Sequence, residues 1–213
     1  MPILAGFMVP HPPLIVPAIG KGGEEQILDT TKAYERVAEE IAALQPDTLI
    51  ITSPHSVMYA DYFHISPGSK AEGSFRQYRA PGVRFSEQYD TELVNRICEL
   101  ADAENLPAGT LGERDKDLDH GTMVPLWFIR NKYTKGKLVR IGLSGLPLTE
   151  HYRLGQLIPE AAAPVVRQRV GLVDKQHAAY GRLEFLLHGF RCPAHVFRHK
   201  IAAAHLHQLS FLT

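Results

Sequence analysis

Cysteine is scarce in this chain: Cys98 and Cys192 are the only two among 213 residues. Two cysteines cannot build the disulfide framework of a small secreted domain. Cys98 also falls on the apolar side of a predicted helix, where a packed thiol is expected. The composition therefore predicts a reduced, cytoplasmic chain.

Net charge is absent as well, because 23 Lys and Arg balance 23 Asp and Glu at a pI of about 7.2. Such a balance gives no basic field toward nucleic acid or an anionic membrane. The apolar N-terminal stretch lacks the basic start of a signal peptide, and its prolines interrupt any membrane-spanning helix. We expect no nucleic-acid partner and no membrane partner.

No internal repeat and no local metal motif such as His-Glu-x-x-His occurs. The chain does contain alternating strand and helix patterns: an apolar run, an amphipathic helix over 24–44 and a second apolar run over 49–52. That order predicts an α/β fold with a mostly parallel sheet. Further patterns predict strands over 61–67 and 137–144, helices starting at the caps Asp90, Thr122 and Thr149, and a polar loop over 68–81 that could act as a lid.

Two histidines stand where predicted strands end. The first apolar run stops at His11, which lies between two prolines, and the second stops at Pro54-His55. The carboxyl ends of parallel strands share one edge of the sheet, and ligands bind there. Two neutral imidazoles at that edge suit Fe(II) if one carboxylate joins them, or zinc if a third ligand and a water do. The spacing leaves both metals open.

A third histidine, His120, stands beside Asp119 just before a helical pattern. A histidine in this position is better placed to move protons than to bind a metal, so we predict a general acid/base. Asp119 could equally be a simple loop cap. His64 lies inside a strand pattern, and we expect it to pack rather than to bind a metal.

Five motifs follow one another along the chain: Val9-Pro-His-Pro-Pro13, Ser53-Pro-His-Ser56, Tyr62-Phe-His-Ile-Ser-Pro-Gly68, Gly112-Glu-Arg-Asp-Lys116 and Leu118-Asp-His-Gly-Thr-Met-Val-Pro-Leu126. Together they resemble the class III extradiol ring-cleavage dioxygenase (LigB-type) superfamily, and most closely the LigB-like domain of AmmeMemoRadiSam system proteins. The resemblance covers residues 1–160 and implies a three-layer αβα fold around a mostly parallel sheet. It also implies an Fe(II) site with His11 and His55 as metal ligands, His120 as catalytic acid/base, and a catechol-type aromatic diol and O2 as substrates.

The end of the chain departs from that family. The family continues with a Gly-Asp-Leu-Ser-His motif and a later glutamate as third metal ligand, and neither is visible here, although residues 170–174 could occupy the strand position. Seven of the eleven histidines lie between residues 151 and 213. We therefore predict that residues 161–213 are an atypical segment, truncated or frame-shifted. Loss of the third ligand would then leave the protein inactive.

Two other functions stay open at this point. One is a Memo-type protein of the same fold that binds a metal without dioxygenase activity, and the other is a hydrolase that uses zinc-bound water. The sequence leaves the identity of the substrate and the oligomeric state open, a homo-oligomer included.

Overall fold

Parallel strands form the centre of the protein. The computed structural model describes residues 3–163 and 170–173, which all lie in the first of two units, residues 1–179 and 180–213. Four strands form one parallel sheet in the order β1-β8-β2-β7. Their bounds are β1 Ile3–Phe7, β2 Thr48–Ser53, β7 Lys137–Gly142 and β8 Val170–Val173. The predicted α/β fold is confirmed, and the segment at 170–173 joins the sheet between β1 and β2.

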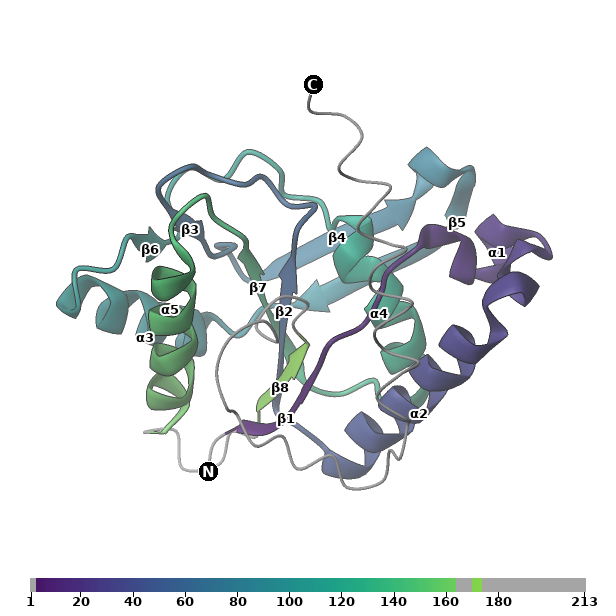
Figure 1. The fold of residues 1–213 in the computed structure, drawn as a ribbon, viewed down its shortest axis with the longest axis horizontal. Coiled ribbons are helices and arrows are strands. Elements are labelled where there is room, and N and C mark those ends of the chain that lie inside the picture. Colours follow the sequence, from purple (N-terminus) through teal and green to yellow (C-terminus); the bar gives the residue numbers. More distant parts are fainter. Residues whose placement is uncertain (1–2, 164–169, 174–213) are drawn as a thin grey trace. The chain divides into compact units, whose positions relative to one another are not determined.

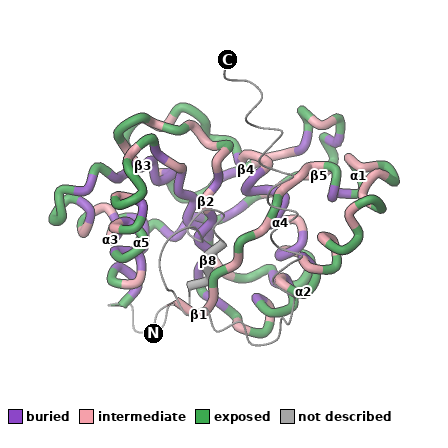
Figure 2. The backbone as a smooth tube through the Cα atoms, viewed as in Figure 1, coloured by how far each residue is buried: buried purple, intermediate pink, exposed green. Residues whose placement is uncertain are grey.

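Side chains of the central strand β2 alternate between two hydrophobic cores. Leu49 and Ile51 pack into one core and Ile50 into the other, and all three are fully buried. A parallel sheet that is apolar on both faces needs helices on both. Figure 1 shows α2 and α4 on one side of the sheet and α3 and α5 on the other, and Figure 2 shows buried residues along β2. The bounds are α2 Leu28–Leu44, α3 Thr91–Ala103, α4 His120–Lys132 and α5 Leu148–Ala162, so the three-layer αβα arrangement is confirmed.

The segment over 68–81, predicted to be a polar loop, instead belongs to an antiparallel hairpin. The hairpin looks polar in sequence because only one of its faces is covered: Lys70 is exposed, whereas Ala71 and Phe75 are buried. The loop prediction was wrong because this alternation was overlooked. The hairpin consists of β4 (Lys70–Phe75), the helical turn η3 (Arg76–Tyr78) and β5 (Ala80–Gln88).

The predicted helix caps are right in one case and wrong in two. Asp90 caps α3, as predicted, and accepts a hydrogen bond from the backbone N–H of Leu93 at 3.2 Å. The N-cap of α4 is Asp119 instead of Thr122, because the aspartate carboxylate captures the free N–H groups one turn earlier. Helix α5 likewise starts before Thr149, directly after a proline N-cap without a side-chain hydrogen bond.

The remaining elements are short, and the helix predicted from residue 24 begins as a 3-10 turn. None of the described helices is long and apolar enough to cross a bilayer. The prediction of an atypical segment over 161–213 falls mostly on residues outside the described ones, and it stays a prediction. The short elements are η1 Pro13–Ile15, α1 Pro17–Gly20, η2 Gly23–Ile27, β3 Phe63–His64 and β6 Ala108–Gly109.

Candidate metal centre

His11 projects from the segment that follows β1. The hydroxyl of Tyr34, on α2, donates a hydrogen bond to the carbonyl of Pro10, one residue before the histidine. Tyr34 is buried and stacks on Phe128 of α4, with ring centroids 4.4 Å apart. Burial raises the pKa of the Tyr34 hydroxyl, so it remains a protonated donor. Two helices thus fix the backbone that carries His11.

His55 lies in a turn that follows β2 and is closed by Ser53. The backbone N–H of His55 donates to Ser53 Oγ at 3.2 Å, and the Ser56 hydroxyl donates to the Ser53 carbonyl at 3.1 Å. Ser53 is fully buried, whereas His55 is exposed. The imidazole therefore reaches outward from a turn whose base is fixed in the core.

His120 is the first residue of α4, and Asp119 caps that helix. The Asp119 carboxylate accepts hydrogen bonds from the backbone N–H of Thr122 at 3.1 Å and from the Thr122 hydroxyl at 3.0 Å. It also accepts one from Ser53 Oγ at 2.5 Å. This last bond joins the cap below His120 to the turn that carries His55. The interpretation of Asp119 as a cap is confirmed.

Gly121 allows α4 to come this close to the end of β2. A Cβ at position 121 would lie 2.4 Å from Ser53 Oγ, 3.0 Å from Asp119 Oδ1 and 3.1 Å from His55 Cδ2. The first of these distances is shorter than any normal contact of a carbon atom. Only glycine fits between the two histidine-bearing segments without moving them.

Arg140 of β7 holds the loop that leads to α4. Its guanidinium is buried and donates to the carbonyls of Asp115 at 2.8 Å and Asp117 at 2.6 Å, and to Ser66 Oγ at 2.7 Å. The Glu113 carboxylate lies 3.9 Å away and offsets the positive charge. A buried charge needs such partners, and the same contacts fix the path of the loop toward His120.

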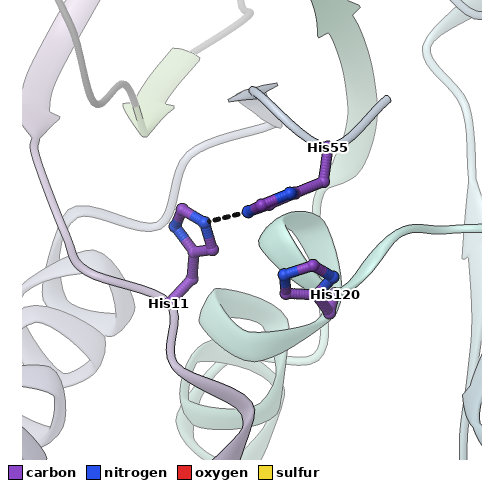
Figure 3. A group of neighbouring side chains, drawn as sticks. All are labelled: His11, His55 and His120. Atoms are coloured by element: carbon purple, nitrogen blue, oxygen red, sulfur yellow. Dashed lines mark hydrogen bonds between the residues drawn. The ribbon is translucent and has the colours of Figure 1, made fainter. Parts of the chain in front are cut away.

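The three imidazoles converge where β1 and β2 end (Figure 3). His11 Nε2 and His55 Nε2 lie 2.7 Å apart. The ring centroids of His55 and His120 are 3.9 Å apart, and those of His11 and His120 are 5.7 Å apart. One ring nitrogen from each histidine lies within 4.8 Å of the other two. The structure thus brings together all three residues that the sequence singled out.

The chemistry of these donors fits a divalent transition metal. Two imidazole nitrogens facing each other at 2.7 Å must share either a proton or a cation, because two lone pairs would repel. Imidazole is a common ligand of both iron and zinc. Within residues 3–163 and 170–173, the cluster contains three histidines and no carboxylate. The three described imidazoles match a catalytic zinc donor set, whereas the usual Fe(II) set would need a carboxylate in addition.

His64, which was expected to pack, lies outside this cluster. It is buried on β3, and its ring centroid is 5.9 Å from that of Tyr59. Burial, and to a lesser degree the charge of Arg140, lowers the pKa of His64. Its Nε2 atom has no hydrogen-bond partner among the residues that the structure describes. The site thus uses three of the four histidines in the first 120 residues.

Three residues of the site were not predicted. Ser53 and Gly121 adjoin His55 and His120 in the sequence motifs, and this adjacency was a usable signal. Tyr78 gave no such signal, because it lies in the segment interpreted as a polar loop. In the structure its ring centroid is 5.5 Å from that of His120, at an interplanar angle of 71°.

Residues 5–167 match the family model described as the catalytic LigB subunit of aromatic ring-opening dioxygenase. The chain belongs to the LigB family. This confirms the resemblance carried by the five motifs. Members of the LigB family are metal-dependent, and the histidine cluster gives this LigB domain residues that could hold a metal.

Two curated relatives resemble the same part of the chain. Protein CA_C1420 of Clostridium acetobutylicum is 38% identical over 163 residues, which cover 73% of this chain and 35% of that protein. The 2-aminophenol 1,6-dioxygenase beta subunit of a Pseudomonas species is 29% identical over 141 residues, covering 62% of this chain and 45% of that protein. The chain thus spans less than half the length of either relative.

One solved structure is also similar in part. The uncharacterized protein JW3007 of Escherichia coli K12 aligns with 79% of this chain and 64% of its own, at 17% identity and a TM-score of 0.44.

Proposed function

We propose that this LigB domain is an Fe(II)-dependent extradiol ring-cleavage dioxygenase that acts on a catechol-type aromatic with O2. The observation that carries the proposal is the convergence of His11, His55 and His120 at the carboxyl edge of the sheet in a chain of this family. A relative named as a 2-aminophenol dioxygenase subunit supports an aromatic substrate with two adjacent polar groups. Because the chain spans only part of its relatives, the activity of a whole protein is part of this proposal.

His11 and His55 are the proposed metal ligands. Their Nε2 atoms lie 2.7 Å apart on two separately anchored segments. Rotation of the two side chains, without a change in the backbone, would let both nitrogens bind one cation at about 2.0–2.1 Å. Bound Fe(II) would supply the redox chemistry needed to incorporate O2 into the ring. The Pro10 and Ser53 contacts hold the backbone from which the two imidazoles project.

His120 is the proposed general acid/base. Its ring centroid lies 3.9 Å from that of His55, so a substrate hydroxyl beside the metal ligands would be within its reach. It would take the proton from this hydroxyl and return it after ring opening. The capped N-terminus of α4 holds His120 in place for both steps.

One observation favours a second candidate, a zinc-dependent hydrolase. The described cluster has three imidazoles and no carboxylate, which is a donor set that catalytic zinc uses together with a bound water. A Memo-type metal protein without dioxygenase activity would share the same ligands.

Metal analysis of tag-free protein, followed by a turnover assay, tests these proposals. The protein is loaded with Fe(II) without oxygen, mixed with a panel of catechols and exposed to air. Oxygen uptake with appearance of a coloured ring-opened product supports the dioxygenase. Hydrolysis without oxygen uptake by zinc-loaded protein supports the hydrolase, and bound metal with neither activity supports the Memo-type protein.

Histidine variants then test the proposed roles. His11→Ala and His55→Ala should each lose most of the bound metal, whereas His120→Gln should keep the metal and lose turnover. His151→Gln, on α5 in the other core, is a control that removes one histidine away from the cluster. Unchanged metal content in both alanine variants would place the metal elsewhere. Metal loss in His120→Gln would make that residue a ligand instead.

A further inference from the structure

The turn of the β4–β5 hairpin supplies an aromatic ring to the edge of the histidine cluster. Tyr78 ends the helical turn between the two strands, and its ring makes an edge contact with His120, with centroids 5.5 Å apart. Phe75, just before the same turn, is fully buried, and its ring centroid lies 6.1 Å from that of Tyr78. The core therefore anchors this turn, and Tyr78 occupies its half-buried end.

The hairpin is attached to the segment that carries His120. The backbone N–H of Leu118 donates to the carbonyl of Glu72 at 2.9 Å. Gly73 permits a close approach, since a Cβ there would lie 2.7 Å from Met123 Sδ and 2.8 Å from Leu118 Cβ. Contacts on both sides of His120 thus hold the hairpin, so the distance from Tyr78 to His120 is set by backbone packing.

The Tyr78 hydroxyl differs from those of four other tyrosines among the described residues. Three of these hydroxyls donate to backbone carbonyls: Tyr34 to Pro10, Tyr59 to Gly112 and Tyr133 to Pro46. The fourth, that of Tyr62, accepts a hydrogen bond from the backbone N–H of Leu111. Within the described part of the chain, the hydroxyl of Tyr78 has no hydrogen bond, although its ring is packed at the site. The Tyr89 hydroxyl also has no partner, but it is buried. Tyr78 is only partly buried and its hydroxyl is not among the buried unpartnered atoms, so it is open to a ligand.

We infer that Tyr78 contacts the aromatic substrate: its ring packs against the substrate ring, and its hydroxyl donates a hydrogen bond to a polar substituent of the substrate. Tyr78 is then a specificity-determining residue beside the acid/base His120. The inference rests on the proposed dioxygenase function, because that function supplies an aromatic ligand at the cluster. It adds a binding element that comes from the hairpin and not from the central sheet.

Binding of 4-nitrocatechol to metal-loaded protein without oxygen, followed by visible absorption, tests the inference. Tyr78→Phe removes only the hydroxyl and should weaken binding about three- to tenfold, as expected for one neutral hydrogen bond. Tyr78→Leu also removes the ring and should weaken binding further. Tyr152→Phe removes the hydroxyl of an exposed tyrosine on α5 and should bind like the parent. Metal content should be the same in all four proteins.

The outcomes separate this inference from the function on which it rests. If the parent binds 4-nitrocatechol and both Tyr78 variants bind it equally well, the inference is wrong and the proposed function stands. If the metal-loaded parent binds none of it, both are wrong. If Tyr78→Phe loses metal in proportion to its loss of binding, Tyr78 supports the fold of the site and does not contact the substrate. For any catechol that is turned over, a higher KM at nearly unchanged kcat in Tyr78→Phe supports the contact.

Discussion

Replacement of Gly121 by alanine should disturb the histidine cluster. The new Cβ would lie 2.4 Å from Ser53 Oγ, and both the backbone of α4 and that of β2 are held in place around it. Ser53 must therefore rotate or the helix must move. Either change disrupts the hydrogen bond from Ser53 to Asp119 and pushes against the ring of His55.

The expected loss of stability follows from three contributions. Overpacking costs about 1–3 kcal/mol, and loss of a hydrogen bond to a charged carboxylate costs about 1.5–3 kcal/mol. Against these, alanine is a better helix former than glycine by about 1 kcal/mol. The Gly121→Ala variant should therefore be less stable than the parent by about 1.5–5 kcal/mol.

Gly155 offers a matched control for this prediction. It is exposed in the middle of α5, and a Cβ there meets no atom within 4 Å. The same substitution at this position should stabilise the protein by about 0.5–1 kcal/mol, because only helix propensity changes. Urea unfolding at pH 7 measures both variants, and metal titration of the folded proteins should show weaker binding in Gly121→Ala alone. A Gly121→Ala variant that unfolds at the parent's urea concentration and binds metal equally well would refute the reasoning.

Two further predictions concern pH and metal removal. Folding lowers the pKa of His64. Below about pH 6.5 the unfolded chain therefore takes up a proton that the folded chain does not. The free energy of unfolding should fall as the pH falls, by at most about 1.4 kcal/mol per pH unit. Urea unfolding between pH 5 and pH 7.5 should show a shallower acid decline in His64→Phe, and equal slopes in parent and variant would contradict this. Chelation of the metal should leave far-UV circular dichroism and a cooperative unfolding transition intact, with only the modest loss of stability that ligand linkage gives; an unfolded chelated protein would contradict the anchoring described above.

The sequence predicted those features of the fold that depend on local periodicity and on strand ends. Apolar runs ending in Pro-His placed His11 and His55 at one edge of a parallel sheet, and both lie there. The hairpin was not predicted because a strand with only one buried face alternates polar and apolar residues. In a strand this short, the alternation is easily mistaken for a polar loop. The cap of α4 was misplaced by three residues and that of α5 by two, since several nearby residues could cap. The tertiary contact with Ser53, which favours Asp119, is not visible in the sequence.

Three residues outside the cluster hold the segments that carry the three imidazoles, and this decides how the site should respond to change. Tyr34 fixes the backbone before His11, Ser53 fixes the turn of His55 and the cap of His120, and Arg140 fixes the loop that leads to His120. None of these contacts is between two of the histidines. The surrounding layers therefore hold the three histidine-bearing segments, as the proposed catalytic role requires. Ser53 bonds both to the turn of His55 and to the cap of His120, so the Ser53–Asp119 hydrogen bond is a direct contact through which a disturbance at one proposed ligand reaches the proposed acid/base.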